Sequence, residues 1–567
     1  MASWKLIQKA RQILDKEKGT VRKSWGGKFS ICLIYPNSYH VGMSNLGFQT
    51  LYHLLNLEED IACERTFLPT PEDIEEHRQT RTPLFSLESQ KPLSEFDILA
   101  FSISFENDFL NVLSILDLGR IPIESRHRGK EHPLVIAGGI SIFLNPEPLA
   151  QFIDLFILGE AEEVIREFLE AYRLHYSTKK KKDRLLERVA EIEGAYIPKF
   201  YEVTYQEDGR IEAMGPKPGY PPRVKRRWIG EMDRFLTRST LFTQDTEFKG
   251  TALVEVNRGC PRSCRFCAAC FVYYPYRSRS LSTLESMSKD GLTKERRIGL
   301  TGTAVSDYLD LVPLCQHILS QRGGISLASL RVDAISEPLA QCLRESDIHS
   351  VSIAPEAGTE RLRKLLRKGY AEGEILNAVD RLVEQGVLQI KCYFLIGLPS
   401  ETDEDVKAIP DLAKQIRHRI LSRQKGEKGG WNIVLSVNPF IPKPATPFQW
   451  LPLEGVDELK RKLKMIQRGL KGERGIEMIH DLPKWAYLQA LLSKGDRKVG
   501  KILMAAHQLQ GDWSRALRET NFNPDFYVYR WRDLDEIFPW DFIDHGISKE
   551  GLKKEYIRAM GEAGIAI

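Results

Sequence analysis

Nine cysteines occur in this 567-residue chain, and four of them fall within eleven residues. Thiolates are the usual ligands of zinc and iron–sulfur centres, so this cluster indicates metal or redox chemistry. Three thiolates at C-x3-C-x2-C spacing converge only from a tight loop, and Gly259 and Pro261 favour one. The four clustered cysteines are Cys260, Cys264, Cys267 and Cys270.

The spacing alone leaves two kinds of site open. All four thiolates, Cys270 included, would make a closed zinc or electron-transfer site. Three thiolates on a four-iron cluster would instead leave one iron free to bind another molecule. No histidine lies nearby to complete a mixed zinc site. The odd cysteine count, in a chain that begins without a secretory h-region, argues against a disulfide framework.

The amino-acid composition excludes some classes of protein. Hydrophobic residues make up 42% and charged residues 28% of the chain, which excludes disorder as its main state. No apolar run approaches the roughly 20 residues that span a bilayer, so we expect a cytoplasmic protein. The net charge of +4, against 81 basic and 77 acidic residues, neither requires nor excludes a nucleic-acid partner.

The strands and helices predicted around the cysteines follow an α/β pattern along the chain. An N-terminal series of apolar strands alternates with helices such as 44–56, which predicts a Rossmann-like parallel sheet covered on both faces. Six further strands with helices between them predict a partial (βα)6 barrel, with the cysteine loop at the end of its first strand. The last hundred residues read as helical. The expected strands are 29–36, 96–105, 132–139 and 153–160 in the first series, and 251–257, 297–302, 326–332, 350–356, 389–397 and 432–440 in the second.

Changes in composition suggest where the domains meet. Residues 176–228 combine a basic run at 179–182, a hairpin turning at Asp208–Gly209, and the segment GPKPGYPPRVKRR, which is rich in Pro, Gly and positive charge. This composition favours a solvated linker over a strap that contacts phosphate or nucleic acid. The expected domains are an N-terminal helical extension (1–28), a Rossmann-like domain (29–175), this linker (176–228), the barrel (229–465) and a helical C-terminal domain (466–567).

Several segments resemble one enzyme superfamily. RGCPRSCRFC is similar to the signature of radical S-adenosylmethionine (radical SAM) enzymes. LTGTAVSDY, SIAPEAGTERLRKLLRKG and FLIGLPSETDED resemble the later strand ends of that superfamily, which contact SAM. Upstream, VIAGG, NPEPLAQFID and LGEAEE resemble the N-terminal B12-binding-type domain of one branch. The resemblance covers about residues 29–450.

The resemblance implies a mechanism and a set of residues. Cys260, Cys264 and Cys267 would hold a [4Fe–4S] cluster whose fourth iron binds SAM, and an electron from a flavodoxin or ferredoxin would cleave SAM to a 5′-deoxyadenosyl radical. The substrate class, small molecule or macromolecule, stays open. The residues that the resemblance places around SAM are Phe266, Gly302, Glu356, Gly397 and Pro399.

The N-terminal domain adds a third expected cofactor. Rossmann-like sheets bind ligands at the carboxyl ends of their strands. Ser102, Ser104, Gly138 and Gly139 stand at such ends and are the expected cobalamin contacts. No DxHxxG motif supplies a histidine below cobalt, and His40 has the wrong spacing. Either the domain binds cobalamin without a histidine, or it has lost the cofactor.

Three functions follow from these features. The leading one is cobalamin-dependent methylation, or another radical modification, of a substrate. The second is RNA modification of the methylthiotransferase kind, although those enzymes carry three more N-terminal cysteines and a C-terminal β-barrel. The third is a non-catalytic zinc or iron–sulfur interaction module.

Overall fold

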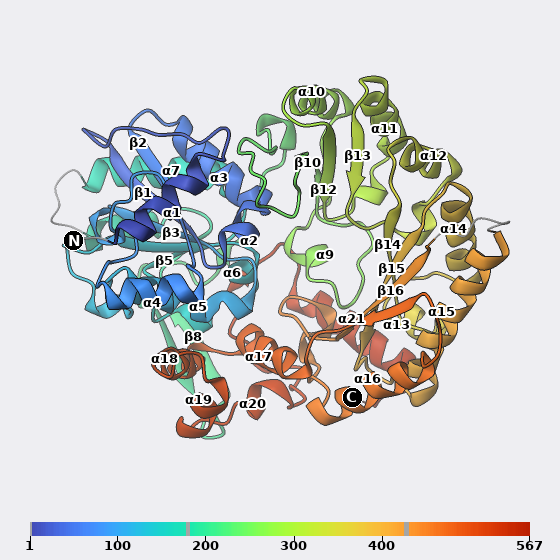
Figure 1. Ribbon diagram of the computed structural model, residues 1–567. Helices are drawn as coiled ribbons and strands as arrows, with labels where there is room; N and C mark the ends of the chain where they lie inside the picture. The colour runs from blue at the N-terminus through green and yellow to red at the C-terminus, as the bar shows by residue number, and fades with distance from the viewer. Residues whose placement is uncertain (1–2, 177–181, 424–429, 567) are drawn as a thin grey trace.

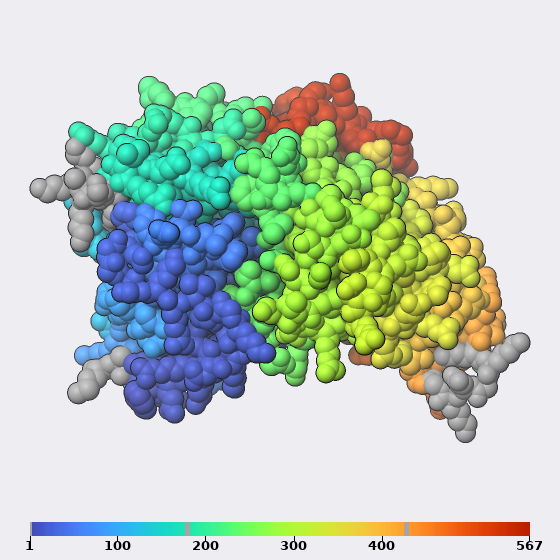
Figure 2. All heavy atoms as spheres, turned by 90° about the horizontal axis from the view of Figure 1, so that it is seen from above, coloured from blue at the N-terminus to red at the C-terminus, as the bar shows by residue number. Residues whose placement is uncertain are grey.

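The computed structural model describes residues 3–176, 182–423 and 430–566. Two α/β lobes lie side by side, and helices near the C-terminus lie next to both (Figure 1). From above, green spheres from the part of the chain beyond residue 200 lie along the junction between the lobes (Figure 2). None of the helices in these ranges is long and apolar enough to cross a membrane.

The N-terminal lobe is built on a six-stranded sheet in the order β2-β1-β3-β4-β5-β6. The first five strands are parallel and β6 is antiparallel to β5, so the expected Rossmann-like sheet is confirmed. Its strands are β1 (Phe29–Tyr35), β2 (Ile61–Phe67), β3 (Ile98–Ser102), β4 (Leu134–Gly138), β5 (Leu155–Ile157) and β6 (Ala195–Tyr196).

Strand β2 was not expected, because its sequence IACERTF carries two charges in a fully buried strand. Arg65 is compensated by partners that are distant in sequence: it pairs with Glu17 at 2.6 Å and with Glu88 at 2.7 Å. Buried charges persist when they are paired in this way. The strand is therefore recognisable only once those partners are in place.

Two groups of helices cover this sheet. Helix α3 packs against α7 in one group, while α4 packs against both α1 and α5 in the other. The helices of this lobe are α1 (Trp4–Leu14), α2 (Tyr39–Met43), α3 (Leu46–Leu57), α4 (Pro71–Gln79), α5 (Phe109–Leu118), α6 (Ile140–Leu144), α7 (Ala161–Tyr176) and α8 (Lys182–Val189).

The region expected as a linker contains α8 and the antiparallel hairpin of β7 (Tyr201–Tyr205) and β8 (Ile211–Pro216). The basic run at 179–182 lies outside the described residues except for Lys182, which pairs with Asp154 at 3.1 Å. Strand β9 (Val224–Lys225) then pairs with β18 (Ile543–Asp544) from near the C-terminus. The linker is thus attached to the C-terminal region.

The second lobe is an open barrel of parallel strands. Strands β10, β12 and β13 form one sheet and β14 to β17 form another, and a parallel bridge between Leu330 and Ile353 joins the two. The strands are β10 (Thr251–Arg258), β12 (Arg297–Gly302), β13 (Gly324–Leu327), β14 (Ser350–Glu356), β15 (Gln389–Ile396), β16 (Asn432–Pro439) and β17 (Ile476–Ile479), with β11 (Arg277–Ser278) antiparallel to β10.

This arrangement confirms the six-stranded partial barrel and adds a seventh parallel strand, β17. The expected third strand, 326–332, is shorter and begins earlier, at Gly324. Along β15 the side chains alternate: Cys392 and Phe394 are buried, whereas Lys391 and Tyr393 are partly exposed on the other face. One face of the barrel sheet therefore packs on helices and the other remains open.

Helices flank the barrel strands on the outside, as the olive to orange ribbons show (Figure 1). They are α10 (Leu281–Leu292), α11 (Leu311–Ser320), α12 (Glu337–Glu345), α13 (Glu360–Leu365), α14 (Glu372–Glu384), α15 (Asp403–Arg423) and α16 (Val456–Gly469), and the short α9 (Ala269–Val272) follows the cysteine loop.

The C-terminal region is mostly helical, as expected. Helix α18 packs against α5 of the first lobe, whereas α21 packs against the segment that follows β16 in the second. This region thus bridges the two lobes. Its helices are α17 (Pro483–Lys494), α18 (Gly500–Gln508), α19 (Trp513–Glu519), α20 (Asp525–Val528) and α21 (Lys549–Glu562).

Candidate functional site

The cysteine loop leaves the carboxyl end of β10 and is fastened to the end of β12. The Asn257 amide nitrogen donates to the Ala304 carbonyl at 2.8 Å, and the Asn257 amide oxygen accepts from the Ala304 N–H at 3.0 Å. The Thr303 hydroxyl donates to the Gly259 carbonyl, which belongs to the loop itself. Two strand ends of the barrel are thereby held together at its mouth. Sequence reasoning assigned no role to Asn257.

All four clustered cysteines meet in this loop. Interaction with the Cys270 thiol lowers the pKa of Cys260 to about 6 and also lowers the pKa values of Cys264 and Cys267. The same interaction raises the pKa of Cys270. The lowered pKa values shift the other three thiols toward the thiolate, which is the form that binds metals.

Within the described residues, no group of three or more His, Cys, Asp or Glu side chains is arranged to hold a metal ion.

Two arginines of the loop attach it to other parts of the chain. The Arg265 side chain, 1% exposed, donates to Glu555 at 2.8 Å and pairs with Glu562, both on α21. Arg262 pairs with Asp307, which follows β12. The C-terminal helix thus supports the cysteine loop from about 290 residues further along the chain, a contact that the local sequence pattern did not reveal.

The residues expected around SAM lie at different distances from the loop. Gly302 lies against Asn257, since a Cβ at position 302 would meet the Asn257 Oδ1 atom at 2.5 Å. Glu356 has a φ of +68° and pairs with Lys368 at 3.1 Å. Burial raises the pKa of Glu356, and Lys368 opposes that shift; Cys264 acts in turn on the pKa of Lys368. Gly302 and Glu356 therefore neighbour the loop.

Gly397 faces helix α16. Its N–H donates to Glu401 at 2.7 Å, and a Cβ at this position would lie 3.0 Å from Leu459. Its φ of +80° fits the strand-to-turn geometry there, because glycine adopts such values without strain. Pro399 and Phe266 are both partly exposed. The structure does not bring Gly397 into the cavity described next.

A cavity of about 820 Å³ lies between the two lobes. On one side it is lined by the carboxyl ends of the N-terminal sheet, including the four residues expected to contact cobalamin: Ser102, Ser104, Gly138 and Gly139. On the other side it is lined by the ends of β10 and β12, at Asn257, Arg258 and Gly302. A ligand in this cavity would contact both lobes.

Gly138 and Gly139 are glycines for different structural reasons. A Cβ at Gly139 would lie 2.3 Å from the Ile103 carbonyl oxygen, and φ is +112°, so the local backbone requires glycine there. A Cβ at Gly138 would approach nothing closer than 3.4 Å. Glycine at 138 is therefore not demanded by packing, and it leaves room at the cavity wall.

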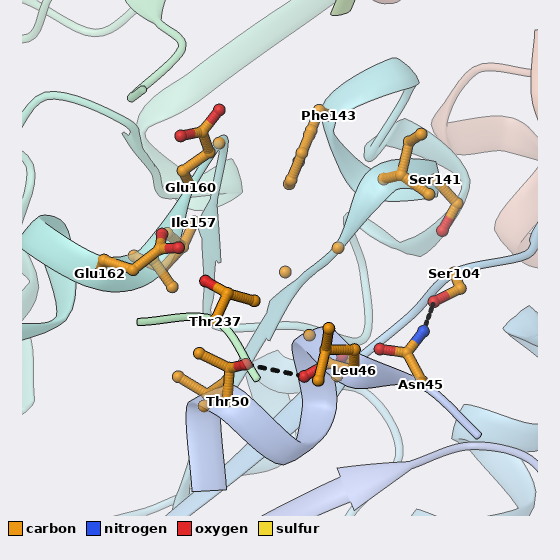
Figure 3. Close-up of a pocket in the computed structure, with 18 of the residues that line it drawn as sticks. Asn45, Leu46, Thr50, Ser104, Ser141, Phe143, Ile157, Glu160, Glu162 and Thr237 are labelled. Atoms are coloured by element: carbon orange, nitrogen blue, oxygen red, sulfur yellow. Dashed lines mark hydrogen bonds between the residues drawn. The ribbon is translucent and has the colours of Figure 1, made fainter. Parts of the chain in front are cut away.

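The cavity extends between α3 and α7 as an apolar slot, which sequence reasoning missed. In the close-up, Thr50 and Leu46 lie on α3, below Ile157 at the end of β5 (Figure 3). The signal was present as the apolar faces of the two helices, but a core helix has the same pattern. The slot is lined by Leu51, Leu54, Leu55, Ile136, Ile157, Ile165, Phe168 and Leu169.

A buried ion network forms the polar wall of the cavity and joins the lobes. Glu160, which follows β5, accepts from Arg258 at 3.0 Å and from Arg277 at 2.7 Å. Burial would raise the pKa of Glu160, but Arg258 and Arg277 hold it below its usual value. Arg258 also pairs with Glu162 and Glu255. Glu160 and Glu162 both lie beside the cavity (Figure 3). Since Arg258 stands two residues before Cys260, the N-terminal lobe contacts the cysteine loop through this network.

A second polar contact closes another wall. Lys443, after β16, donates to Glu106 at 2.6 Å, and Gln489 of α17 donates to the other Glu106 oxygen at 3.0 Å. All three residues line the cavity. Three parts of the chain, the N-terminal lobe, the barrel and the C-terminal helices, therefore meet here.

The described residues that line the cavity include no histidine. His40 instead lies exposed beside Asp245 at 2.8 Å and Glu247 at 3.2 Å, and hydrogen bonds to these two raise its pKa. The geometry gives His40 no place under a cavity ligand.

Comparisons with known proteins agree with this geometry. A family model described as "Radical SAM superfamily" matches residues 254–413, and one described as "Radical SAM proteins, N-terminal" matches residues 47–198. An uncharacterized protein of Methanocaldococcus jannaschii, MJ0966, is 29% identical over 84% of this chain and 90% of its own length. A tRNA-2-methylthio-N(6)-dimethylallyladenosine synthase of Clostridium tetani is 25% identical over 32% of this chain and 44% of its own.

One solved structure has the same fold over most of the chain. It is the methyltransferase TsrM of Kitasatospora setae, solved with cobalamin and a [4Fe–4S] cluster bound, which aligns with a TM-score of 0.50 at 13% identity. The alignment covers 87% of this chain and all of that one. At this identity the likeness is one of fold.

Proposed function

Because the chain belongs to the radical SAM superfamily, we propose that it is a cobalamin-dependent radical SAM enzyme that methylates, or otherwise modifies by radical chemistry, a substrate held at the barrel mouth. The observation that carries the proposal is the cavity between the lobes. It is bounded by the carboxyl ends of both sheets, and the cysteine loop begins two residues after Arg258 in its wall. Such strand ends are where both fold types bind ligands.

The cysteine loop fits a thiolate-ligated cluster. Cys260, Cys264 and Cys267 are the residues whose thiols are shifted toward the thiolate form, and they would be its ligands. Bound there, a [4Fe–4S] cluster with SAM supplies the one-electron chemistry of the superfamily. Asn257 and Thr303 would hold the Gly302 segment against the loop, and Glu356 with Lys368 would present a charged pair beside it. Phe266 and Pro399, which are both partly exposed, would shape the surroundings of the adenine.

The residues that line the cavity would also suit cobalamin. The slot between α3 and α7 is apolar and would take the flat base of the nucleotide tail. Ser102 and Ser104 offer hydroxyls near the mouth of the slot, and Gly138 leaves room for close approach. Ser102, Ser104, Gly138 and Gly139, which all line the cavity, would hold the nucleotide tail by hydroxyl and backbone contacts.

The protein's own residues would do three things during the reaction. The Glu160–Arg258 network would hold the cysteine loop against the N-terminal lobe and so fix the distance between the two cofactor sites. The apolar slot would exclude water from the cavity floor. The Glu106–Lys443 pair would keep the barrel and the C-terminal helices closed over the side of the cavity.

Anaerobic reconstitution with iron, sulfide, hydroxocobalamin, SAM and a low-potential reductant tests the proposal. We expect 5′-deoxyadenosine in mass spectra of the reaction, together with cobalamin that remains bound through gel filtration. Cys264→Ala should lose the visible cluster absorbance and the 5′-deoxyadenosine, since it removes one iron ligand. Cys315→Ala, at a buried cysteine in the barrel core, is the matched control and should keep both. SAM cleavage that survives in Cys264→Ala would overturn the cluster assignment.

A further inference from the structure

Cys270 lies outside the triplet of expected cluster ligands, yet the backbone holds it near two of them. The Cys267 N–H donates to the Cys264 carbonyl at 3.1 Å, and the Cys270 N–H donates to the Cys267 carbonyl at 3.2 Å. These are two successive turns, each closed by an i→i+3 hydrogen bond, and such a turn holds the Cα atoms of its end residues within about 7 Å. Cys264, Cys267 and Cys270 are therefore held close together in the loop.

The environment of Cys270 sets it apart from the other cysteines outside the triplet. Its side chain interacts with the thiols of Cys260, Cys264 and Cys267 together, and it is only 4% exposed. Cys315, Cys342 and Cys392 instead lie in the barrel core, and Cys32 and Cys63 lie on strands of the N-terminal sheet. Among the nine cysteines, Cys270 is thus the one placed to join the triplet.

We propose that Cys270 supplies a fourth thiolate to the cluster while SAM is absent, and that SAM displaces it. This inference rests on the proposed function, in which three cysteines leave one iron for SAM. Cys270 would keep that iron ligated until SAM binds. The same loop backbone would then hold a resting site, in which Cys270 ligates the fourth iron, and a working site, in which SAM does.

The ligand exchange balances in atoms and charge. When the resting site forms, the Cys270 S–H bond breaks, its proton goes to solvent, and a sulfur–iron bond forms. When SAM binds, that sulfur–iron bond breaks and the amino and carboxylate groups of SAM take its place. The amino group of free SAM is an ammonium, so it gives up one proton on binding iron, and the Cys270 thiolate takes up one proton. No electron changes place in either step.

A closed resting site has a measurable consequence, because an iron without a protein ligand is the one that a [4Fe–4S] cluster loses on mild oxidation. Wild-type protein without SAM should therefore keep its [4Fe–4S] cluster under mild ferricyanide treatment. Cys270→Ala should convert to [3Fe–4S] several-fold more readily, as seen by electron paramagnetic resonance. Mössbauer spectra of ⁵⁷Fe-labelled wild type should show four alike iron sites, and added SAM should make one of them distinct.

Controls separate the alternatives. Cys315→Ala should behave as wild type, and circular dichroism checks that each variant is folded. Equal conversion of wild type and Cys270→Ala to [3Fe–4S] overturns the inference. A folded Cys270→Ala protein that assembles no cluster even with SAM also overturns the inference. So does a wild-type iron site that SAM leaves unchanged. In both cases Cys270 would be a permanent ligand.

Different results test the role of Cys270 and the proposed function. Wild-type protein that cleaves SAM but matches Cys270→Ala in oxidation disproves the role of Cys270 alone. Wild-type protein that carries a cluster but yields no 5′-deoxyadenosine, with no spectral change on adding SAM, disproves the proposed function itself.

Discussion

At the scale of single residues, Glu401 is a carboxyl at the turn after β15 whose side chain is 2% exposed. It accepts from the Gly397 N–H at 2.7 Å and from Lys462 at 2.8 Å, and Lys462 also pairs with Glu454. Burial raises the pKa of Glu401 to about 7, despite the attraction of Lys462. The turn that carries Gly397 is therefore held by a carboxyl that titrates near neutral pH.

The sign of the resulting pH dependence follows from linkage. A carboxyl whose pKa is higher in the folded than in the unfolded state binds more protons when folded, so its contribution to stability falls as pH rises from about 4.5 to about 7. We expect the urea midpoint of the wild-type protein to fall over this range, and the fall to be smaller in Glu401→Gln. Glu404→Gln, at an exposed position on the same segment, should follow the wild type. Identical pH profiles for all three proteins would contradict this assignment.

At the scale of elements, the cysteine loop depends on a helix that is remote in sequence. Helix α21 contributes Glu555 and Glu562 to Arg265, and the Arg265 guanidinium also donates to the Leu365 carbonyl at 2.8 Å, in α13. An iron ligand set needs a preorganised loop, since ligand positions decide affinity. We therefore regard α21 as part of the site, although it carries no residue expected to bind a cofactor.

Removing the Arg265 side chain should loosen the loop. Breaking a buried ion pair from one side costs about 3–5 kcal/mol, because the partner charges lose their compensation. The two glutamates are partly exposed, so we expect Arg265→Ala to lie at the lower end, about 3 kcal/mol. Hydrogen exchange should be faster across residues 260–270. Lys554→Ala, at an exposed position on the same helix, is the control. Unchanged exchange in Arg265→Ala would mean that α21 does not support the loop.

At the scale of the whole molecule, the cavity exists because two lobes meet. Its floor comes from the N-terminal sheet with α3 and α7, its opposite wall from the barrel, and one side from Gln489 of the C-terminal helices. The Glu160–Arg258 and Glu106–Lys443 pairs hold these parts in place. Its volume of about 820 Å³ lies within the range of pockets that bury most of the surface of a drug-sized ligand.

Filling the apolar slot should block cobalamin and spare the cluster. Leu54→Trp places a larger ring in the slot, and overpacking costs about 1–3 kcal/mol. Retention of hydroxocobalamin should fall about tenfold or more, which corresponds to about 1.4 kcal/mol. The cluster absorbance should persist. Leu57→Trp, at an exposed position on the same helix, is the matched control and should bind cobalamin as wild type does. Full retention by Leu54→Trp would place cobalamin elsewhere or exclude it.

The sequence by itself determined the local features of this protein. The two strand series, the hairpin at Asp208–Gly209 and the loop around Cys260 follow from side-chain periodicity and from turn residues, and both act over a few neighbouring positions. The family also followed from such local segments, since the cysteine spacing and the strand-end motifs are each contiguous. The family-model matches over residues 47–198 and 254–413 agree with it.

Only the tertiary structure decided which of these segments meet. The contacts of Arg65 with Glu17, of Glu160 with Arg258, and of Arg265 with Glu555 join residues that are 48, 98 and 290 positions apart. Gly397 belongs to a motif expected at SAM, yet its neighbours come from α16. Each of these contacts depends on how lobes and helices pack, and packing energies are summed over surfaces that no single segment contains.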